Sequence, residues 1–236
     1  MKIAVANGDG IGPEIMEAVI SVFKAANLPL EYHFVDMGKW VFDKGFSNGM
    51  TPEAKATIEQ LGILFKGPME TPKGKGVKSV NVTARKTWNT YANERHFQTL
   101  SGVNTVFSKA GINIDLTIVR ENIEDTYGGI EHMLTQDVAI ARRFISRGGS
   151  EQVIRYAFEM ARKKGAKRIT CGHKANIMKL TDGLFLEVFN EIAKEYTDLK
   201  ADDVIVDDLC MKLVSRPDLF DVIVLTNLQG DIVSDL

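Results

Sequence analysis

Two aspartates near the end of the sequence are the first residues whose spacing suggests chemistry. Asp231 and Asp235 are four residues apart, so a helix that starts near Gly230 would carry both carboxylates on one face. With a third carboxylate they would form a hard-oxygen site suited to Mg²⁺ or Mn²⁺. Asp207 and Asp208 close a predicted strand, and either is a candidate for the third ligand or, equally, for the N-cap of the next helix.

A group of arginines, together with a hydroxyl and an amide, forms a second candidate site. Its members are Ser79, Asn81, Arg85, Arg95 and Arg120. Because the planar guanidinium group pairs with a carboxylate through two hydrogen bonds, such a group is suited to a substrate with several carboxylates. For any single arginine in the group, a place on a solvated helix face is the more ordinary role.

A tyrosine and a lysine follow predicted strands and are further candidates. Tyr127 lies in a polar segment after a strand, and it would become a general acid if a cation or metal nearby tuned its hydroxyl. Packing is its ordinary role. Lys174 and Asn176 follow a strand that ends at Cys171, and ligands of open α/β sheets bind outside the carboxyl ends of strands. An ordinary polar loop is the alternative.

The glycine-rich segment 7–14 follows a strand and opens a helix, as a phosphate-binding loop would. Its glycines do not match G-x-G-x-x-G, and no Lys-Ser/Thr pair follows. Because glycine turns between strands and helices are common, the segment alone is weak evidence for a nucleotide site.

The elements that must position these residues alternate between strand and helix, which is typical of a largely parallel α/β sheet. The predicted strands are 2–6, 30–35, 63–66, 112–120, 129–135, 138–146, 168–171, 204–206 and 221–226. The predicted helices are 13–26, 52–61, 150–164 and 183–196. The strands 129–135 and 138–146 form a plausible hairpin, and Ser150 is the expected N-cap of the helix that follows. We expect a domain boundary near residues 91–101.

Apolar residues recur at helical spacing in two of the predicted helices. In the first helix these are Ile15, Val19, Val22, Phe23 and Ala26. In the helix 150–164, Val153, Ile154, Ala157, Phe158 and Ala161 form an apolar face.

Composition indicates a soluble globular protein of one or two domains. Hydrophobic residues make up 44% and charged residues 25% of the 236 residues. A net charge of -2 gives no support for nucleic-acid binding. The two cysteines, Cys171 and Cys210, show no pairing or metal spacing and fit a reducing compartment. We see no signal peptide or membrane span, so we expect a cytoplasmic protein, with the mitochondrial matrix as the alternative.

Five segments together resemble the isocitrate/isopropylmalate dehydrogenase family of metal-dependent β-decarboxylating dehydrogenases. They read N-G-D-G-I-G-P-E at 7–14, S-V-N-V-T-A-R at 79–85, R-E-N-I-E-D-T-Y-G-G-I-E at 120–131, H-K-A-N-I-M-K at 173–179 and N-L-Q-G-D-I-V-S-D at 227–235. The resemblance covers essentially the whole chain. It implies a two-domain α/β fold with an incomplete sheet in the first domain.

The resemblance also implies a role for each domain. Residues 1–90 would be the N-terminal part of the large, cofactor-side domain. Residues 91–236 would be the small domain for substrate, metal and dimerisation, with a hairpin arm at about 129–146.

The activity that the resemblance implies is the oxidative decarboxylation of isocitrate to 2-oxoglutarate, with NAD⁺ or NADP⁺ and with Mg²⁺ or Mn²⁺. Its catalytic residues would be Tyr127 and Lys174. The substrate would be bound by Ser79, Asn81, Arg85, Arg95 and Arg120, the cofactor by Lys66, Thr71 and Asn176, and the metal by Asp207, Asp231 and Asp235. Family members are homodimers, in which Lys174 and Asp207 would reach into the partner's site.

One pair of residues favours isocitrate within the family. The isocitrate branch has a Ser and an Asn at the positions of Ser79 and Asn81, where the isopropylmalate branch has bulkier apolar groups. The alternatives are a related dehydrogenase that acts on homoisocitrate, isopropylmalate or tartrate, and a non-catalytic regulatory subunit.

The chain departs from the family pattern in two places. It reads Arg95-His96-Phe97-Gln98 where the family commonly has R-P-V-R. Family members also continue through a segment that completes the first sheet and binds the adenosine part of the cofactor. We therefore expect this chain alone to associate and to be inactive in NAD(P) reduction.

Overall fold

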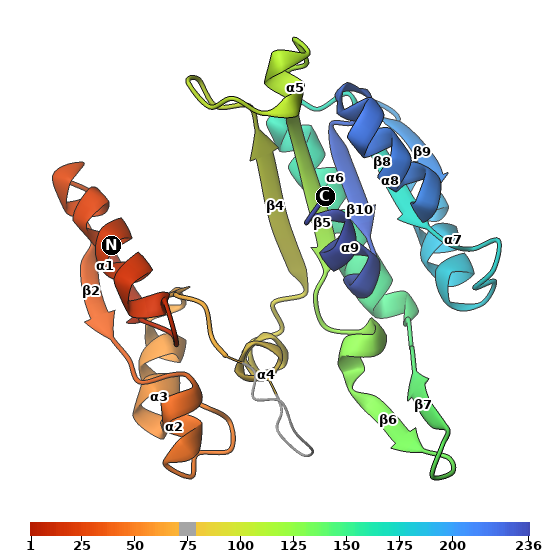
Figure 1. The fold of residues 1–236 in the computed structure, drawn as a ribbon. Coiled ribbons are helices and arrows are strands. Elements are labelled where there is room, and N and C mark those ends of the chain that lie inside the picture. The colour runs from red at the N-terminus through yellow and green to blue at the C-terminus, as the bar shows by residue number, and fades with distance from the viewer. Residues whose placement is uncertain (71–78) are drawn as a thin grey trace. The chain divides into compact units, whose positions relative to one another are not determined.

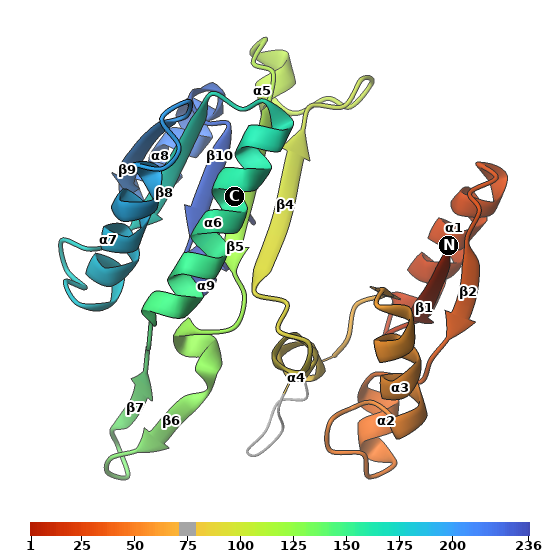
Figure 2. The same ribbon diagram turned by 180° about the vertical axis from the view of Figure 1, so that it is seen from behind.

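The computed structural model describes residues 1–70 and 79–236 of the chain. It divides into two compact units, which we call unit 1 (Met1–Trp88) and unit 2 (Asn89–Leu236). Figures 1 and 2 show the elements of both units from opposite sides. The predicted α/β class is confirmed, since both units combine helices with parallel strands.

Within the described part of unit 1, three parallel strands form a sheet in the order β2-β1-β3. They are β1 (Lys2–Ala6), β2 (Glu31–Phe34) and β3 (Leu64–Lys66). The helices of unit 1 are α1 (Gly12–Ala25), α2 (Lys39–Asp43), α3 (Pro52–Leu61) and α4 (Val80–Thr87). Successive side chains of β1 point to opposite faces, so one face packs on α1 and the other on α3 and α4.

The apolar residues whose spacing predicts α1 are not the ones that this helix buries most deeply. Met16 and Ile20, four residues apart, point into the core. Ile15 is 41% exposed and Val22 is 64% exposed. Because apolar residues lie on several sides of this helix, its sequence pattern alone does not fix the face that contacts the sheet.

Unit 2 contains a five-stranded sheet in the order β4-β5-β10-β8-β9 among its described residues. The strands are β4 (Ala92–Gln98), β5 (Asp115–Glu121), β8 (Arg168–His173), β9 (Lys200–Ile205) and β10 (Val222–Leu225). All neighbouring pairs are parallel except β4 with β5. The carboxyl ends of β5, β10, β8 and β9 therefore lie at the same edge.

Two helices cover each face of this sheet. On one face, α6 (Arg147–Lys164) and α7 (Thr181–Ala193) pack on apolar side chains of the strands, as Figure 2 shows. On the other face lie α8 (Val206–Ser215) and α9 (Asn227–Val233). The short elements of unit 2 are the helix α5 (Val106–Lys109) and the 3₁₀ helices η1 (Asp125–Gly128) and η2 (Pro217–Leu219).

The predicted hairpin is present, as the antiparallel pair β6 (Ile130–Met133) and β7 (Ala139–Arg142). The predicted buried face of α6 is confirmed, because all five of its predicted residues are fully buried. The predicted cap of α6 was wrong. Ser146 is the N-cap and accepts from the amide of Gly149, whereas Ser150 lies inside the helix. Both serines precede the same apolar stripe, and the helix begins at the earlier one.

No helix in the described ranges is long and apolar enough to cross a membrane. Both cysteines are free thiols: Cys171 lies in the core under α6 and α7, and Cys210 is half-buried.

Candidate active site

The candidate residues of unit 2 gather at the edge of the sheet where its parallel strands end. Arg120 lies near the carboxyl end of β5, Lys174 follows β8, and Asp207 lies in the first turn of α8 after β9. Asn227 begins α9 directly after β10. This edge is where open α/β sheets place ligands.

The guanidinium group of Arg120 is held rigidly although it is almost completely buried. Its Nε lies 3.0 Å from the carbonyl oxygen of Asn227, and its Nη2 lies 2.8 Å from Oδ1 of the same residue. A Cβ added to Gly230 would lie 2.7 Å from Cγ of Arg120. Only glycine therefore lets α9 approach β5 this closely.

Asp231 is the carboxylate on which the other side chains converge. Its Oδ1 accepts from Nη1 of Arg120 and, at 3.1 Å, from Nη2 of Arg95. Its Oδ2 accepts from the hydroxyl of Tyr127 at 2.6 Å. The Arg120 guanidinium also lies 5.0 Å from the centre of the Tyr127 ring. We call Arg95, Arg120, Tyr127 and Asp231 the Asp231 cluster.

These contacts set the protonation states of the cluster. Burial and the hydrogen bond to Asp231 raise the pKa of Tyr127, against the opposing charge of Arg120. Burial works to raise the pKa of Asp231, but the Tyr127 hydroxyl and the two arginines outweigh it and lower that pKa. At neutral pH, the cluster therefore holds an ionised carboxylate beside a protonated phenol.

The helix that carries Asp231 differs from the predicted one. We expected it to start near Gly230 and to present Asp231 and Asp235 on one face. It begins at Asn227 and ends at Val233, so Asp235 lies beyond its last residue. Arg95 nevertheless contacts both, with Nη1 3.5 Å from Oδ1 of Asp235.

Lys174 and Asp207 form an ion pair of their own, between Nζ and Oδ1. The hydrogen bond from Lys174 lowers the pKa of Asp207, which is largely exposed. The described residues contain no group of three or more histidines, cysteines or acidic residues that could hold a metal ion. Asp207 thus does not join Asp231 and Asp235 within one copy of the chain.

The donor types in unit 2 fit a hard divalent cation, but one copy does not supply enough of them. Asp231 and Asp235 both lie within reach of the Arg95 guanidinium, and carboxylate oxygens are the ligands that Mg²⁺ and Mn²⁺ prefer. A cation would replace the arginine contacts of Asp231. The coordination of such a cation would be completed by water, by a substrate or by a further ligand group.

Unit 1 holds the remaining substrate candidates on α4. Ser79 is the N-cap of this helix and accepts from the amide of Val82 at 3.5 Å. The Oδ1 atom of Asn81 is buried and has no hydrogen-bond partner among the described residues. Such an orphaned polar atom is costly unless a ligand or water satisfies it. Arg85 is half-buried in the last turn of the helix.

Lys66 lies at the end of β3, with Nζ 3.3 Å from the carbonyl oxygen of Gly67. Partial desolvation, and then the positive charge of Arg85, lower the pKa of Lys66. Two cations held close together form a surface that an anion would stabilise. Of the other cofactor candidates, Asn176 is exposed after β8, and Thr71 lies outside the described residues.

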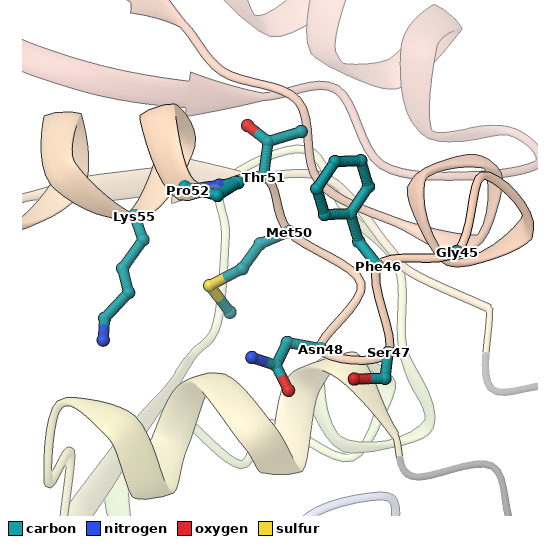
Figure 3. Close-up of a pocket in the computed structure, with 8 residues that line it drawn as sticks. All are labelled: Gly45, Phe46, Ser47, Asn48, Met50, Thr51, Pro52 and Lys55. Atoms are coloured by element: carbon teal, nitrogen blue, oxygen red, sulfur yellow. The ribbon is translucent and has the colours of Figure 1, made fainter.

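The loop between α2 and α3 supports α4. A Cβ added to Gly49, whose φ is +64°, would lie 2.2 Å from Cγ2 of Val80. Beside this contact is an open pocket of about 320 Å³, shown in Figure 3. Residues 45–48, 50–52 and 55 line it, and none of the predicted site residues does.

The glycines of segment 7–14 serve close packing. A Cβ added to Gly8 would lie 2.1 Å from the carbonyl oxygen of Pro68. The Asp9 carboxylate accepts from the amides of Lys39 and Glu70 at 2.9 and 3.0 Å. These contacts account for the motif without a phosphate.

Sequence reasoning gave no role to Asn227, although it lies inside a recognised motif. It also missed Arg143, which binds two buried carboxylates, Asp125 and Asp182. The signal for Asn227 was its place in the segment 227–235, whereas Arg143 lies outside all five segments that carry the family resemblance.

Comparisons with known proteins agree on one family. The model of the family described as isocitrate/isopropylmalate dehydrogenase matches residues 2–236. The chain is 48% identical, over 99% of its length and 47% of the relative's, to the NADP isocitrate dehydrogenase of Thermus thermophilus. It is 43% identical, over 97% of its length and 63% of the relative's, to the chloroplastic 3-isopropylmalate dehydrogenase of Solanum tuberosum.

A solved structure agrees as well. The crystal structure of isocitrate dehydrogenase from Methylococcus capsulatus matches with a TM-score of 0.92 and 44% identity, over 99% of this chain and 69% of that one. The chain spans about half the length of the first curated relatives it matches, 47% for the Thermus enzyme.

Proposed function

The chain belongs to the isocitrate/isopropylmalate dehydrogenase family, and we propose that it contributes to the oxidative decarboxylation of isocitrate to 2-oxoglutarate. The oxidant would be NAD⁺ or NADP⁺, and the metal Mg²⁺ or Mn²⁺. The observation that carries the proposal is the Asp231 cluster, in which Arg95, Arg120 and Tyr127 contact a single carboxylate.

The arginines of the cluster support a substrate with several carboxylates. Arg120 is anchored by Asn227 before any ligand arrives, so little side-chain entropy is lost when it binds one. Arg95 is 28% exposed and is accessible to a solute. A bidentate carboxylate would match the guanidinium group of Arg95. In unit 1, we propose Ser79, Asn81 and Arg85 as further substrate ligands.

Proton transfer is assigned to the two candidates at the strand ends. Lys174 would act as a neutral amine and take the proton of the substrate hydroxyl while the hydride passes from the same carbon to NAD⁺ or NADP⁺. Loss of CO₂ would then leave an enolate, and Tyr127 would donate its phenolic proton to the carbon that lost the carboxylate, becoming a phenolate. The contact between the Tyr127 hydroxyl and Asp231 supports this role, because a cation bound at Asp231 would lie close to the phenol that it must tune.

The metal would be held by Asp231 and Asp235, with Asp207 from a second copy as the third carboxylate. When bound, the cation would polarise the substrate carbonyl as a Lewis acid. With Asp207 supplied by a second copy, the active protein would be a homodimer with shared sites. The proposed cofactor ligands are Lys66, Thr71 and Asn176, and the relatives carry both NAD and NADP in their names.

Isopropylmalate is the second candidate substrate, because a relative of that name is 43% identical. Isocitrate is favoured by the polar side chains of Ser79 and Asn81, because a hydroxyl and an amide N–H₂ group could donate to a distal carboxylate that isopropylmalate lacks. A site built to hydrogen-bond a substrate group strongly rejects an analogue without it. Homoisocitrate and tartrate dehydrogenases remain alternatives, as does a regulatory subunit, although Tyr127, Lys174 and the three aspartates are retained.

Ligand-dependent thermal unfolding tests the proposal. Isocitrate with Mg²⁺ at about 100 times its Kd should stabilise the chain by about 2.7 kcal/mol, and isopropylmalate should stabilise it less. The Arg95→Gln and Asp231→Asn variants should lose this response. Arg155→Gln is the matched control, because Arg155 is an exposed arginine of α6 that pairs with Glu195, just after α7, and has no contact with the Asp231 cluster among the described residues. Equal stabilisation of all variants, or none of the wild type, would contradict the proposal.

A further inference from the structure

A buried cation that the proposed chemistry does not use lies close to the Asp231 cluster. Arg143 follows directly after β7, and its side chain is 14% exposed. It lies between two carboxylates, Asp125 and Asp182, whose side chains are fully buried. We call these three residues and Thr226 the Arg143 cluster.

Every nitrogen of the Arg143 guanidinium has an acceptor. Nε lies 2.5 Å and Nη2 3.2 Å from the two carboxylate oxygens of Asp125. Nη1 donates to Oδ1 of Asp182, and Nη2 lies 2.8 Å from Oγ1 of Thr226. This planar fork geometry is specific to arginine, since the ammonium of a lysine cannot reach all these acceptors at once.

The two carboxylates that bind Arg143 also accept hydrogen bonds from other elements of unit 2. Asp125 accepts from the amide of Leu228, in the first turn of α9, at 2.9 Å. Asp182 accepts from the amide of Lys174 at 2.6 Å and from Nε2 of Gln229 at 2.8 Å. One guanidinium group is thereby linked to the backbone of Lys174 and to the turn of α9 that precedes Asp231.

The backbone of Asp125 shows that this arrangement is imposed by the structure around it. Asp125 has a φ of +68°, which side chains other than glycine adopt at a cost. It begins η1, the turn that contains Tyr127, and its amide donates to the carbonyl of Phe144 at 3.0 Å. Asp125 is therefore held at its amide by Phe144 and at its carboxylate by Arg143. Tyr127 lies in the same short turn, so its position depends on these contacts.

We propose that Arg143 is a positioning residue, which holds the Tyr127 turn, the Lys174 backbone and the start of α9 in their mutual register through Asp125 and Asp182. The inference rests on the proposed function for the roles of Tyr127, Lys174 and Asp231.

The test compares the Arg143→Lys variant with the matched control Arg147→Lys by two-dimensional ¹H–¹⁵N NMR. Arg147 also pairs with two carboxylates, those of Glu187 and Glu191, but it is exposed and does not contact the site. In Arg143→Lys, we expect the amide resonances of Leu228, Lys174, Tyr127 and Asp231 to shift together. In Arg147→Lys they stay in place.

The resonances of Tyr127 and Asp231 decide the question, because neither residue hydrogen-bonds to the Arg143 cluster in the described part of the chain. A role in stability alone would lower the melting temperature of Arg143→Lys and leave these native-state resonances unchanged. That outcome would overturn the proposal.

A measurement on the unmodified protein keeps the proposal testable if the variant does not fold. The amides of Leu228 and Lys174 both donate to carboxylates of the Arg143 cluster. Their hydrogen exchange should therefore occur through the same opening, and the two amides should have the same protection factor. Exchange rates that respond differently to low concentrations of denaturant would overturn the proposal. Neither readout requires turnover, so an absence of isocitrate binding would refute the proposed function and leave this result intact.

Discussion

The phenolic oxygen of Tyr127 lies 2.6 Å from Oδ2 of Asp231, although the two residues are 104 positions apart in the chain. The bond joins a turn after β5 to a helix after β10. It gives the proposed acid a partner that affects its proton affinity, since a nearby carboxylate disfavours the phenolate.

We therefore expect Asp231→Asn to lower the pKa of Tyr127. Burial, the hydrogen bond and the negative charge of Asp231 all raise this pKa in the wild type, and Arg120 opposes them. The asparagine amide removes the negative charge and leaves only a neutral acceptor for the Tyr127 hydroxyl, so the charge effect is lost and the hydrogen bond is weakened. Ultraviolet titration in a chelating buffer, with Tyr127→Phe as the subtraction reference, measures the change. The pKa of Tyr156, about 12 beside Glu94, should not move.

The close approach of α9 to β5 predicts that Gly230→Ala destabilises unit 2. The new Cβ would lie 2.7 Å from Cγ and 2.8 Å from Cβ of Arg120, and overpacking of this kind costs about 1–3 kcal/mol. Gly183→Ala is the control, because a Cβ added to that helical glycine would meet no neighbouring side chain within 4 Å. The control should be neutral or stabilise by up to about 1 kcal/mol. Equal urea midpoints for both variants would rule out the clash.

A second pair of glycines tests the support of α4. Gly49 and Gly62 have similar φ values, +64° and +70°, but only the Cβ of Gly49 would meet Val80. Both alanine variants lose about 1–2 kcal/mol to the left-handed backbone, and Gly49→Ala loses more. Adding Val80→Ala should recover part of the difference, with a coupling of about 0.5–3 kcal/mol in a double-mutant cycle. Strict additivity would argue against the contact.

The pH dependence of stability should differ in sign between two glutamates. Burial raises the pKa of Glu121, against the backbone amides of Ile123 and Glu124 that bind its carboxylate. As the pH falls, Glu121 is therefore protonated in the folded state before it is protonated in the unfolded state, whose pKa is about 4.3. The stability that this protonation contributes is fully present below the unfolded pKa and is lost as the pH rises through the folded pKa. Relative to Glu121→Gln, the wild type should gain stability as the pH falls from neutral toward the unfolded pKa of about 4.3.

Glu94 is the opposite-sign control for that experiment. The hydrogen bond from Lys164, against partial burial, lowers the pKa of Glu94. Its contribution is present above the unfolded pKa of about 4.3 and is lost as the pH falls through the folded value. Relative to Glu94→Gln, the wild type should therefore lose stability on acidification. Urea unfolding at several pH values measures both slopes, and equal signs would contradict the assignments.

Hydrogen exchange should separate the two units. In unit 2, the central strand β10 is fully covered by helices on both faces, and its four residues are buried. In unit 1, β2 is an edge strand of the described sheet, and Phe34 on it is 62% exposed. Because amides exchange through the least stable opening available to them, we expect stronger protection in β10 than in β1 or β2. Equal protection factors would contradict this prediction.

The strand and helix pattern was largely predictable where local signals agree. The helix 52–61 was predicted with its observed bounds because Pro52 begins it and Gly62 ends it in the left-handed conformation. The strand β4 was not predicted, because its sequence A-N-E-R-H-F-Q is mostly polar. Its stability comes from pairing with β5, and from Lys164 and Tyr156, which bind Glu94 from α6.

The sequence by itself determined the α/β class, the candidate side chains and the family resemblance, because these depend on residue types and local spacing. Only the tertiary structure decided which candidates meet. Arg95 and Arg120 converge on Asp231, whereas Asp207 pairs with Lys174. It also decided that Arg143 binds two buried carboxylates far away in sequence. Contacts of this kind depend on the order in which the strands pair in the sheet. The spacing of residues along the chain does not determine that strand order.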